Sequence, residues 1–132
     1  MSYETALVWF AIITVFTLML EIWTTYITKG FGFGFSSNRN PQAESSGFPL
    51  RIKRTYQNQI ESAAYIVPVL AAASVTGLEH SGAELAALLL VVGRALYIPL
   101  YYSGVSFIRV PAFGLAMLSA LYIGYILLTS GL

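Results

Sequence analysis

The chain has 132 residues, of which 57% are hydrophobic and only 10% are charged. Soluble domains carry about 25% charged residues, so this composition excludes an ordinary soluble domain and indicates a membrane protein. The absence of cysteine and aspartate, a single histidine and a net charge of +1 exclude disulfides, a three-histidine metal site and a Ser-His-Asp triad, and give no sign of a nucleic-acid partner.

Four stretches of the chain are long and apolar enough to cross a bilayer, which takes about 20 helical residues. Backbone groups in lipid must be satisfied within the spanning segment, so stretches of this length without strand alternation predict helices. The predicted fold class is all-α, an integral membrane four-helix bundle with up-down topology in a single domain, residues 1–132. The predicted spans are 5–28, 55–76, 83–102 and 110–129, and the predicted loop is 29–54.

The long loop, 29–54, contains most of the basic residues of the chain. Its basic residues are Lys29, Arg39, Arg51, Lys53 and Arg54, and its one acid is Glu44. The positive-inside rule therefore places this loop in the cytoplasm. Both termini are then expected outside, and the third loop, which ends near Arg109, inside. The alternating Gly and Phe residues of the loop favour either a flexible lid or an interfacial connector.

Polar side chains recur at one depth in three of the spans. With a rise of about 1.5 Å per residue, Glu21, Asn58, Glu61 and Arg94 fall about 5–12 Å from the predicted cytoplasmic helix ends. Arg54 joins Asn58 and Glu61 at the spacing i, i+4, i+7, which places the three on one helical stripe. Glu21 is interpreted either as a further member of this cluster or as a contact between subunits.

The third span carries a similar stripe. Arg94, Tyr97 and Tyr101 are spaced i, i+3, i+7. Because an unpaired charge in hydrocarbon costs about 3 kcal/mol on insertion scales, we expect Glu61 and Arg94 to pair inside the bundle. The cluster is then either a binding site or a set of polar contacts that fixes helix register. An interfacial aromatic belt is the alternative interpretation for the two tyrosines and the preferred one for Tyr102.

Two strings of the chain are informative when taken together. The second span opens with RTYQNQIE, from Arg54 to Glu61, and so carries the pattern R-x-x-x-N-x-x-E. The third span leads into the fourth through GRALYIPLYYSGVSFIR, from Gly93 to Arg109. In order and spacing, both strings resemble the signatures of the MAPEG family, the membrane-associated proteins in eicosanoid and glutathione metabolism. The resemblance covers roughly residues 50–120.

The resemblance implies a homotrimer that binds glutathione as its cofactor near the cytoplasmic side, between adjacent subunits. By motif position, Arg109 is the implied catalytic residue, which stabilises the glutathione thiolate as a nearby guanidinium can. The implied cofactor-binding residues are Arg54, Asn58, Glu61, Arg94, Tyr97 and Tyr101. No metal is implied, and the thiol must come from glutathione because the chain has no cysteine.

The chain departs from eicosanoid-type members of the family at Gln57, Tyr97, Val110 and Phe113. In these departures it resembles the bacterial branch, which implies a bacterial inner membrane. The predicted function is a glutathione-dependent transferase or peroxidase acting on lipophilic electrophiles. The alternative is a non-catalytic trimeric accessory or binding protein that retains the polar cluster to hold helices together. A small transporter is disfavoured because the chain shows no inverted-repeat symmetry and no discontinuous span.

Overall fold

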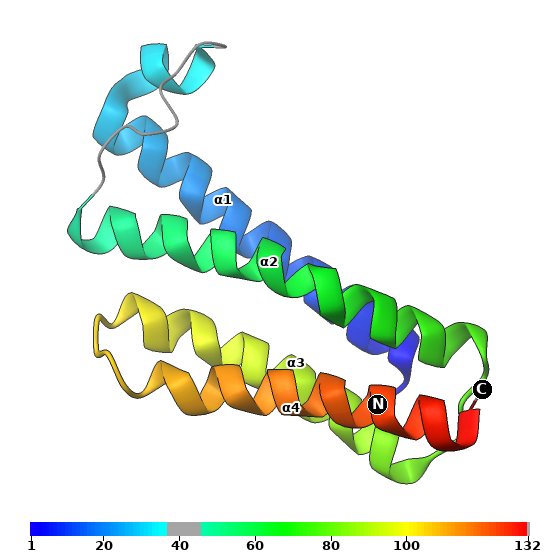
Figure 1. The fold of residues 1–132 in the computed structure, drawn as a ribbon. Helices are drawn as coiled ribbons and strands as arrows, with labels where there is room; N and C mark the ends of the chain where they lie inside the picture. Colours follow the sequence, from blue (N-terminus) through cyan, green and yellow to red (C-terminus); the bar gives the residue numbers. More distant parts are fainter. Residues whose placement is uncertain (37–45, 132) are drawn as a thin grey trace.

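The computed structural model describes residues 1–36 and 46–131, and the chain is helical over most of this range (Figure 1). Among the described residues no strand is present. The predicted all-α fold with four long helices is therefore confirmed. The elements are α1 (Tyr3–Phe35), α2 (Gly47–Val75), α3 (Ser81–Tyr102), α4 (Arg109–Ile126) and a short π-helix, η1 (Leu127–Gly131).

The helices at the first loop extend further than expected. α1 continues to Phe35 through a kink at Gly30, whose φ of 82° is a conformation that glycine adopts without steric cost. α2 begins at Gly47 rather than near residue 55, so helix replaces much of the predicted loop. Residues 37–45 lie outside the described residues. The alternating Gly and Phe residues behind the lid and connector interpretations, residues 30–35, lie at the end of α1.

Within residues 1–36 and 46–131, three helices are long and apolar enough to cross a membrane. They are α1, α3 and α4, with mean hydropathies of 2.1, 1.8 and 1.8 in their most apolar windows. α2 is also long, but its first half carries Arg51, Lys53, Arg54 and Glu61, which lower its hydropathy. The prediction of four apolar spans is thus confirmed for three helices, and α2 combines a polar half with an apolar half.

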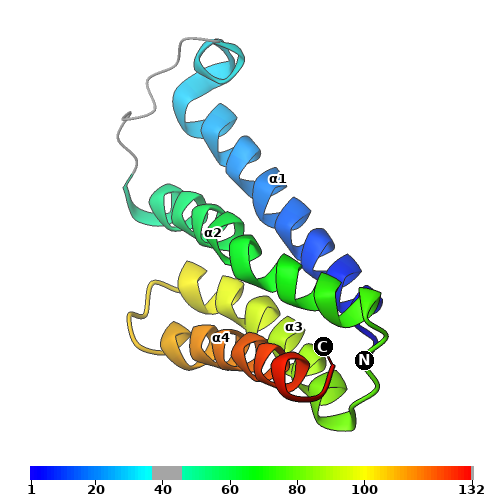
Figure 2. The same ribbon diagram turned by 45° about the vertical axis from the view of Figure 1, so that its right-hand side comes forward.

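The bundle consists of two helical hairpins, α1–α2 and α3–α4, and contacts are most extensive within each hairpin (Figures 1 and 2). Both termini and the α2–α3 turn lie at one end of the bundle in both views. α3 and α4 approach closely at Gly93, where an added Cβ would lie 2.8 Å from the Ala112 carbonyl oxygen and 3.0 Å from the Ala116 nitrogen. The absence of a side chain at Gly93 permits this close packing.

The α2–α3 turn is fixed by local hydrogen bonds. α2 ends in a Schellman motif, in which Gly77 has a φ of 64° and its N–H donates to the Ser74 carbonyl at 3.1 Å. The Leu78 N–H completes the motif by donating to the Ala73 carbonyl at 3.1 Å. His80 then caps α3, because its Nδ1 accepts a hydrogen bond from the backbone N–H three residues further along the chain. The second hairpin therefore starts at a defined position.

Candidate functional site

Arg94 on α3 is the centre of a polar network that crosses the bundle. Its side chain is 0% exposed, and its Nε and Nη2 donate to Gln59 Oε1 at 3.1 and 2.7 Å. Gln59 Nε2 donates in turn to Thr14 Oγ1 at 3.0 Å, and this hydroxyl donates to the Phe10 carbonyl at 2.8 Å. A continuous chain of hydrogen bonds thus connects α3, α2 and α1.

The predicted pairing of Glu61 with Arg94 is wrong. The partner of Arg94 is the amide of Gln59, and the Glu61 side chain is exposed. Arg54 is also exposed, and Asn58 is half-buried. Neighbouring residues on a helix point about 100° apart, so a helix that directs Gln59 at Arg94 does not direct Glu61 there. The buried residues of α2 are Ile52, Thr55, Gln59, Ser62, Ile66, Leu70 and Ala73.

The α3 and α4 members of the predicted site do come together. The Arg94 guanidinium carbon lies 4.6 Å from the centroid of the Tyr97 ring, and that of Arg109 lies 4.2 Å from the Tyr101 ring. The two tyrosine rings are 5.6 Å apart at an angle of 59°. Both tyrosines are buried, so they are not belt residues on the lipid surface. Cation–π contacts therefore hold two guanidinium groups at the ends of one aromatic pair.

Two of the sequence departures lie beside this stack. Phe113 packs against Tyr97, with ring centroids 6.0 Å apart. Val110 is 57% exposed and follows Arg109 at the start of α4, on the outer surface of the chain. Arg109 itself is only half-buried. The stack therefore presents an accessible guanidinium at one end and a fully buried one at the other.

The sequence model of the MAPEG family matches residues 6–129. The chain belongs to the MAPEG family. Searches of curated proteins and of solved structures found no match. The match extends well beyond the two strings that carry the resemblance and includes most of each helix.

In this MAPEG chain, two buried polar atoms of the predicted site have no hydrogen-bond partner. They are Arg94 Nη1, a donor, and Asn58 Oδ1, an acceptor. A buried polar atom without a partner is destabilising by about 1–3 kcal/mol. Such atoms are therefore candidates for contact with a ligand or with a neighbouring subunit, and they lie on two different helices.

Glu21 lies apart from the Arg94 network. Its Oε1 accepts a hydrogen bond from Thr25 Oγ1 at 3.3 Å, one turn further along α1. With Lys53 and Pro49 of α2 it lines a small pocket of about 20 Å³. A space of this size holds about one water molecule, and it lies between α1 and α2, separate from the Arg94 network.

Proposed function

We propose that the chain is a membrane-embedded, glutathione-dependent transferase or peroxidase acting on lipophilic electrophiles. The observation that carries this proposal is the stack of Arg94, Tyr97, Tyr101 and Arg109, which holds two guanidinium groups in a membrane-spanning bundle. Membership of the MAPEG family supports it. A fixed cation at an apolar surface suits chemistry in which a thiolate meets a substrate that is dissolved in the bilayer.

The side chains of the predicted site fit the chemistry of glutathione. Guanidinium groups bind carboxylates through paired hydrogen bonds, as the exposed Arg54 can do, and Arg94 Nη1 can donate to a further acceptor. The exposed carboxylate of Glu61 suits the ammonium group, and the partnerless Asn58 Oδ1 suits a peptide N–H. When bound, glutathione would supply the thiol that this cysteine-free chain lacks. We assign Arg109 the task of favouring the thiolate form of that thiol.

The proposed site is completed between subunits. Arg54 and Glu61 lie on the exposed side of α2, whereas Tyr97 and Tyr101 are buried beside α4. A neighbouring copy that packs on α2 brings the two groups together, and we therefore propose a homotrimer. The charge distribution supports an orientation in a bacterial inner membrane with loops one and three in the cytoplasm. Glutathione then enters from the cytoplasm and the electrophile from the bilayer.

A glutathione titration of the purified protein in detergent tests this function. We expect binding at millimolar glutathione or below and a thiolate absorbance in the ultraviolet. Arg109→Ala should abolish the thiolate absorbance and weaken binding by less than about tenfold, because the other binding groups remain. Lys53→Ala is the matched control, since it removes a cation that lies outside the stack. A titration without heat and without thiolate absorbance would contradict the proposal.

The alternative function, a non-catalytic trimeric accessory or binding protein, also has an observation in its favour. The Arg94 charge already has two hydrogen bonds to Gln59, so the polar network can hold the helices together without a ligand. The same titration separates the two functions. The accessory function requires an intact trimer in which glutathione produces no thiolate signal.

A further inference from the structure

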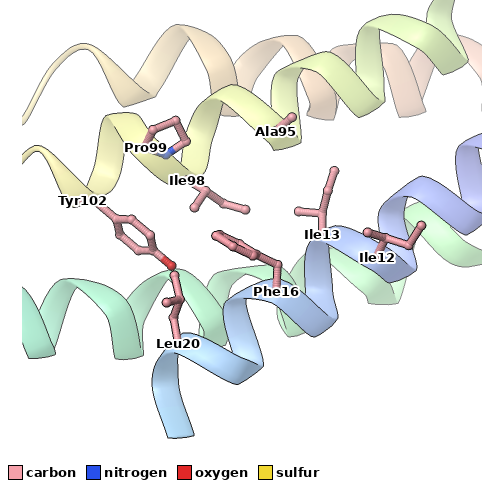
Figure 3. A pocket seen from close by; sticks show the side chains of 8 residues that line it. All are labelled: Ile12, Ile13, Phe16, Leu20, Ala95, Ile98, Pro99 and Tyr102. Carbon is pink, nitrogen blue, oxygen red and sulfur yellow. The ribbon is translucent and has the colours of Figure 1, made fainter. Parts of the chain in front are cut away.

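A long apolar groove runs between α1 and α3 (Figure 3). Its volume is about 520 Å³, within the range of pockets that hold small molecules. One stretch of each helix lines it, and Phe16 extends from α1 toward Ile98 on α3. The lining residues are Ile12, Ile13, Phe16, Leu20, Ala95, Ile98, Pro99 and Tyr102.

Tyr102 brings the one side-chain polar group of this lining. Its hydroxyl oxygen is buried and has no hydrogen-bond partner. Figure 3 shows the ring reaching from α3 toward Leu20 on α1, with the hydroxyl between the two helices. A buried hydroxyl without a partner is unfavourable, so the groove offers an unused hydrogen bond in otherwise apolar surroundings.

A cation is fixed beside Tyr102. Arg51 of α2 donates from its Nε to the Tyr102 carbonyl at 3.0 Å, and its guanidinium carbon lies 5.7 Å from the centroid of the Phe48 ring. Gly104 allows the chain to pass closely, since a Cβ there would lie 3.3 Å from the guanidinium carbon. Arg51 is half-buried and carries several further N–H groups. A positive charge therefore sits next to the end of the groove that carries the free hydroxyl.

We propose that this groove binds one acyl chain of a bilayer phospholipid. α3 ends at Tyr102, where a tyrosine is expected at the membrane interface. The groove lining is apolar apart from the Tyr102 hydroxyl, and Arg51 is held beyond this lining, at the Tyr102 carbonyl. A phospholipid presents an acyl chain, an ester carbonyl and then a phosphate in the same order. The ester carbonyl accepts the hydrogen bond of Tyr102, and the phosphate faces Arg51.

The dimensions favour an acyl chain over a helix of a second copy. The distance from Ile12 to Leu20 along α1 is about 12 Å, close to the roughly 15 Å of hydrocarbon in one leaflet. A helix is about 10 Å wide with its side chains, whereas this groove is lined by side chains of both helices, among them Phe16 and Ile98. The site is independent of the glutathione function, because none of its residues belongs to the Arg94–Arg109 stack.

Photocrosslinking of the full chain in lipid nanodiscs tests the proposal. The probe is a phosphatidylcholine whose acyl chain carries a diazirine, and the labelled peptides are mapped by mass spectrometry. Labelling should concentrate in residues 12–20 and 95–102. Ala95→Trp fills the groove and should lower this labelling about tenfold, and Tyr102→Phe should lower it about threefold through the lost hydrogen bond. Leu121→Trp, at a 68% exposed position of α4, is the control and should change nothing.

Three results would overturn the proposal. Uniform labelling of all exposed helix faces would mean that only annular lipid, without a specific site, surrounds the protein. Groove peptides that stay unlabelled while other faces react would mean that a neighbouring subunit fills the groove. Labelling by a diazirine fatty acid that phosphatidylcholine does not compete away would assign the groove to free fatty acids. Glutathione binding is measured on the same Ala95→Trp sample and should be retained, so a failure of the lipid site and a failure of the glutathione site give different results.

Discussion

Replacing Gln59 by leucine should lower the free energy of unfolding by about 2–4 kcal/mol. The change removes the acceptor of both Arg94 hydrogen bonds and leaves a fully buried guanidinium without a hydrogen-bond partner among the described residues. It also removes the donor to Thr14, so the connection from α3 to α1 is lost. Titration with a denaturing detergent, followed by the fluorescence of Trp9 and Trp23, measures the change.

The double variant Gln59→Leu, Arg94→Met should recover most of this loss, because two apolar side chains then replace a buried polar pair. Glu61→Gln is the matched control, since Glu61 is exposed and should change stability by less than about 0.5 kcal/mol. Additive losses in the double variant would contradict a direct contact between Gln59 and Arg94. A large effect of Glu61→Gln would restore Glu61 as the partner of Arg94.

Gly93→Ala should lower the free energy of unfolding by about 1–3 kcal/mol, although alanine is the better helix former. The added methyl group would lie 2.8 Å from the Ala112 carbonyl oxygen and 3.2 Å from the Ala116 Cβ. Backbone cannot move aside as a flexible side chain can, so α3 and α4 must separate. The same unfolding titration measures the change.

Gly114→Ala on α4 provides the matched control for this effect. An added Cβ at Gly114 meets nothing within 4 Å, so only helix propensity acts there. Propensity favours alanine by up to about 1 kcal/mol, and the control should be neutral or more stable than the original chain. Equal effects of the two substitutions would show that close packing at Gly93 does not determine stability.

The fold could be predicted well from the sequence because long apolar stretches without strand alternation have few solutions in a bilayer. The helix ends beside the first loop could not. Gly30 kinks α1 without ending it, and α2 starts at Gly47 inside a polar stretch. Hydropathy records where lipid begins, whereas helical hydrogen bonding continues into the interface, so the two boundaries differ.

The arrangement of the candidate site residues could be predicted on α3 and not on α2. The stripe of Arg94, Tyr97 and Tyr101 coincides with the buried face of α3. On α2, Asn58 and Gln59 are adjacent amides, and their chemistry alone does not show which one faces Arg94. Gln59 lies on the same helical face as the buried aliphatic residues Ile52, Ile66 and Leu70. The periodicity of these aliphatic residues in the sequence therefore indicated which of the two amides is buried.

Because Arg94 and Gln59 are hydrogen-bonded, the order in which they are synthesised and inserted into the membrane matters. These hydrogen bonds join the second hairpin to the first, so the two hairpins depend on each other through a buried charge. Synthesis proceeds from the N-terminus, and residue 59 leaves the ribosome well before residue 94. The acceptor for the guanidinium is thus available before the guanidinium has to enter the bilayer. Exchanging the order of the two hairpins would remove this advantage while leaving the finished contacts unchanged.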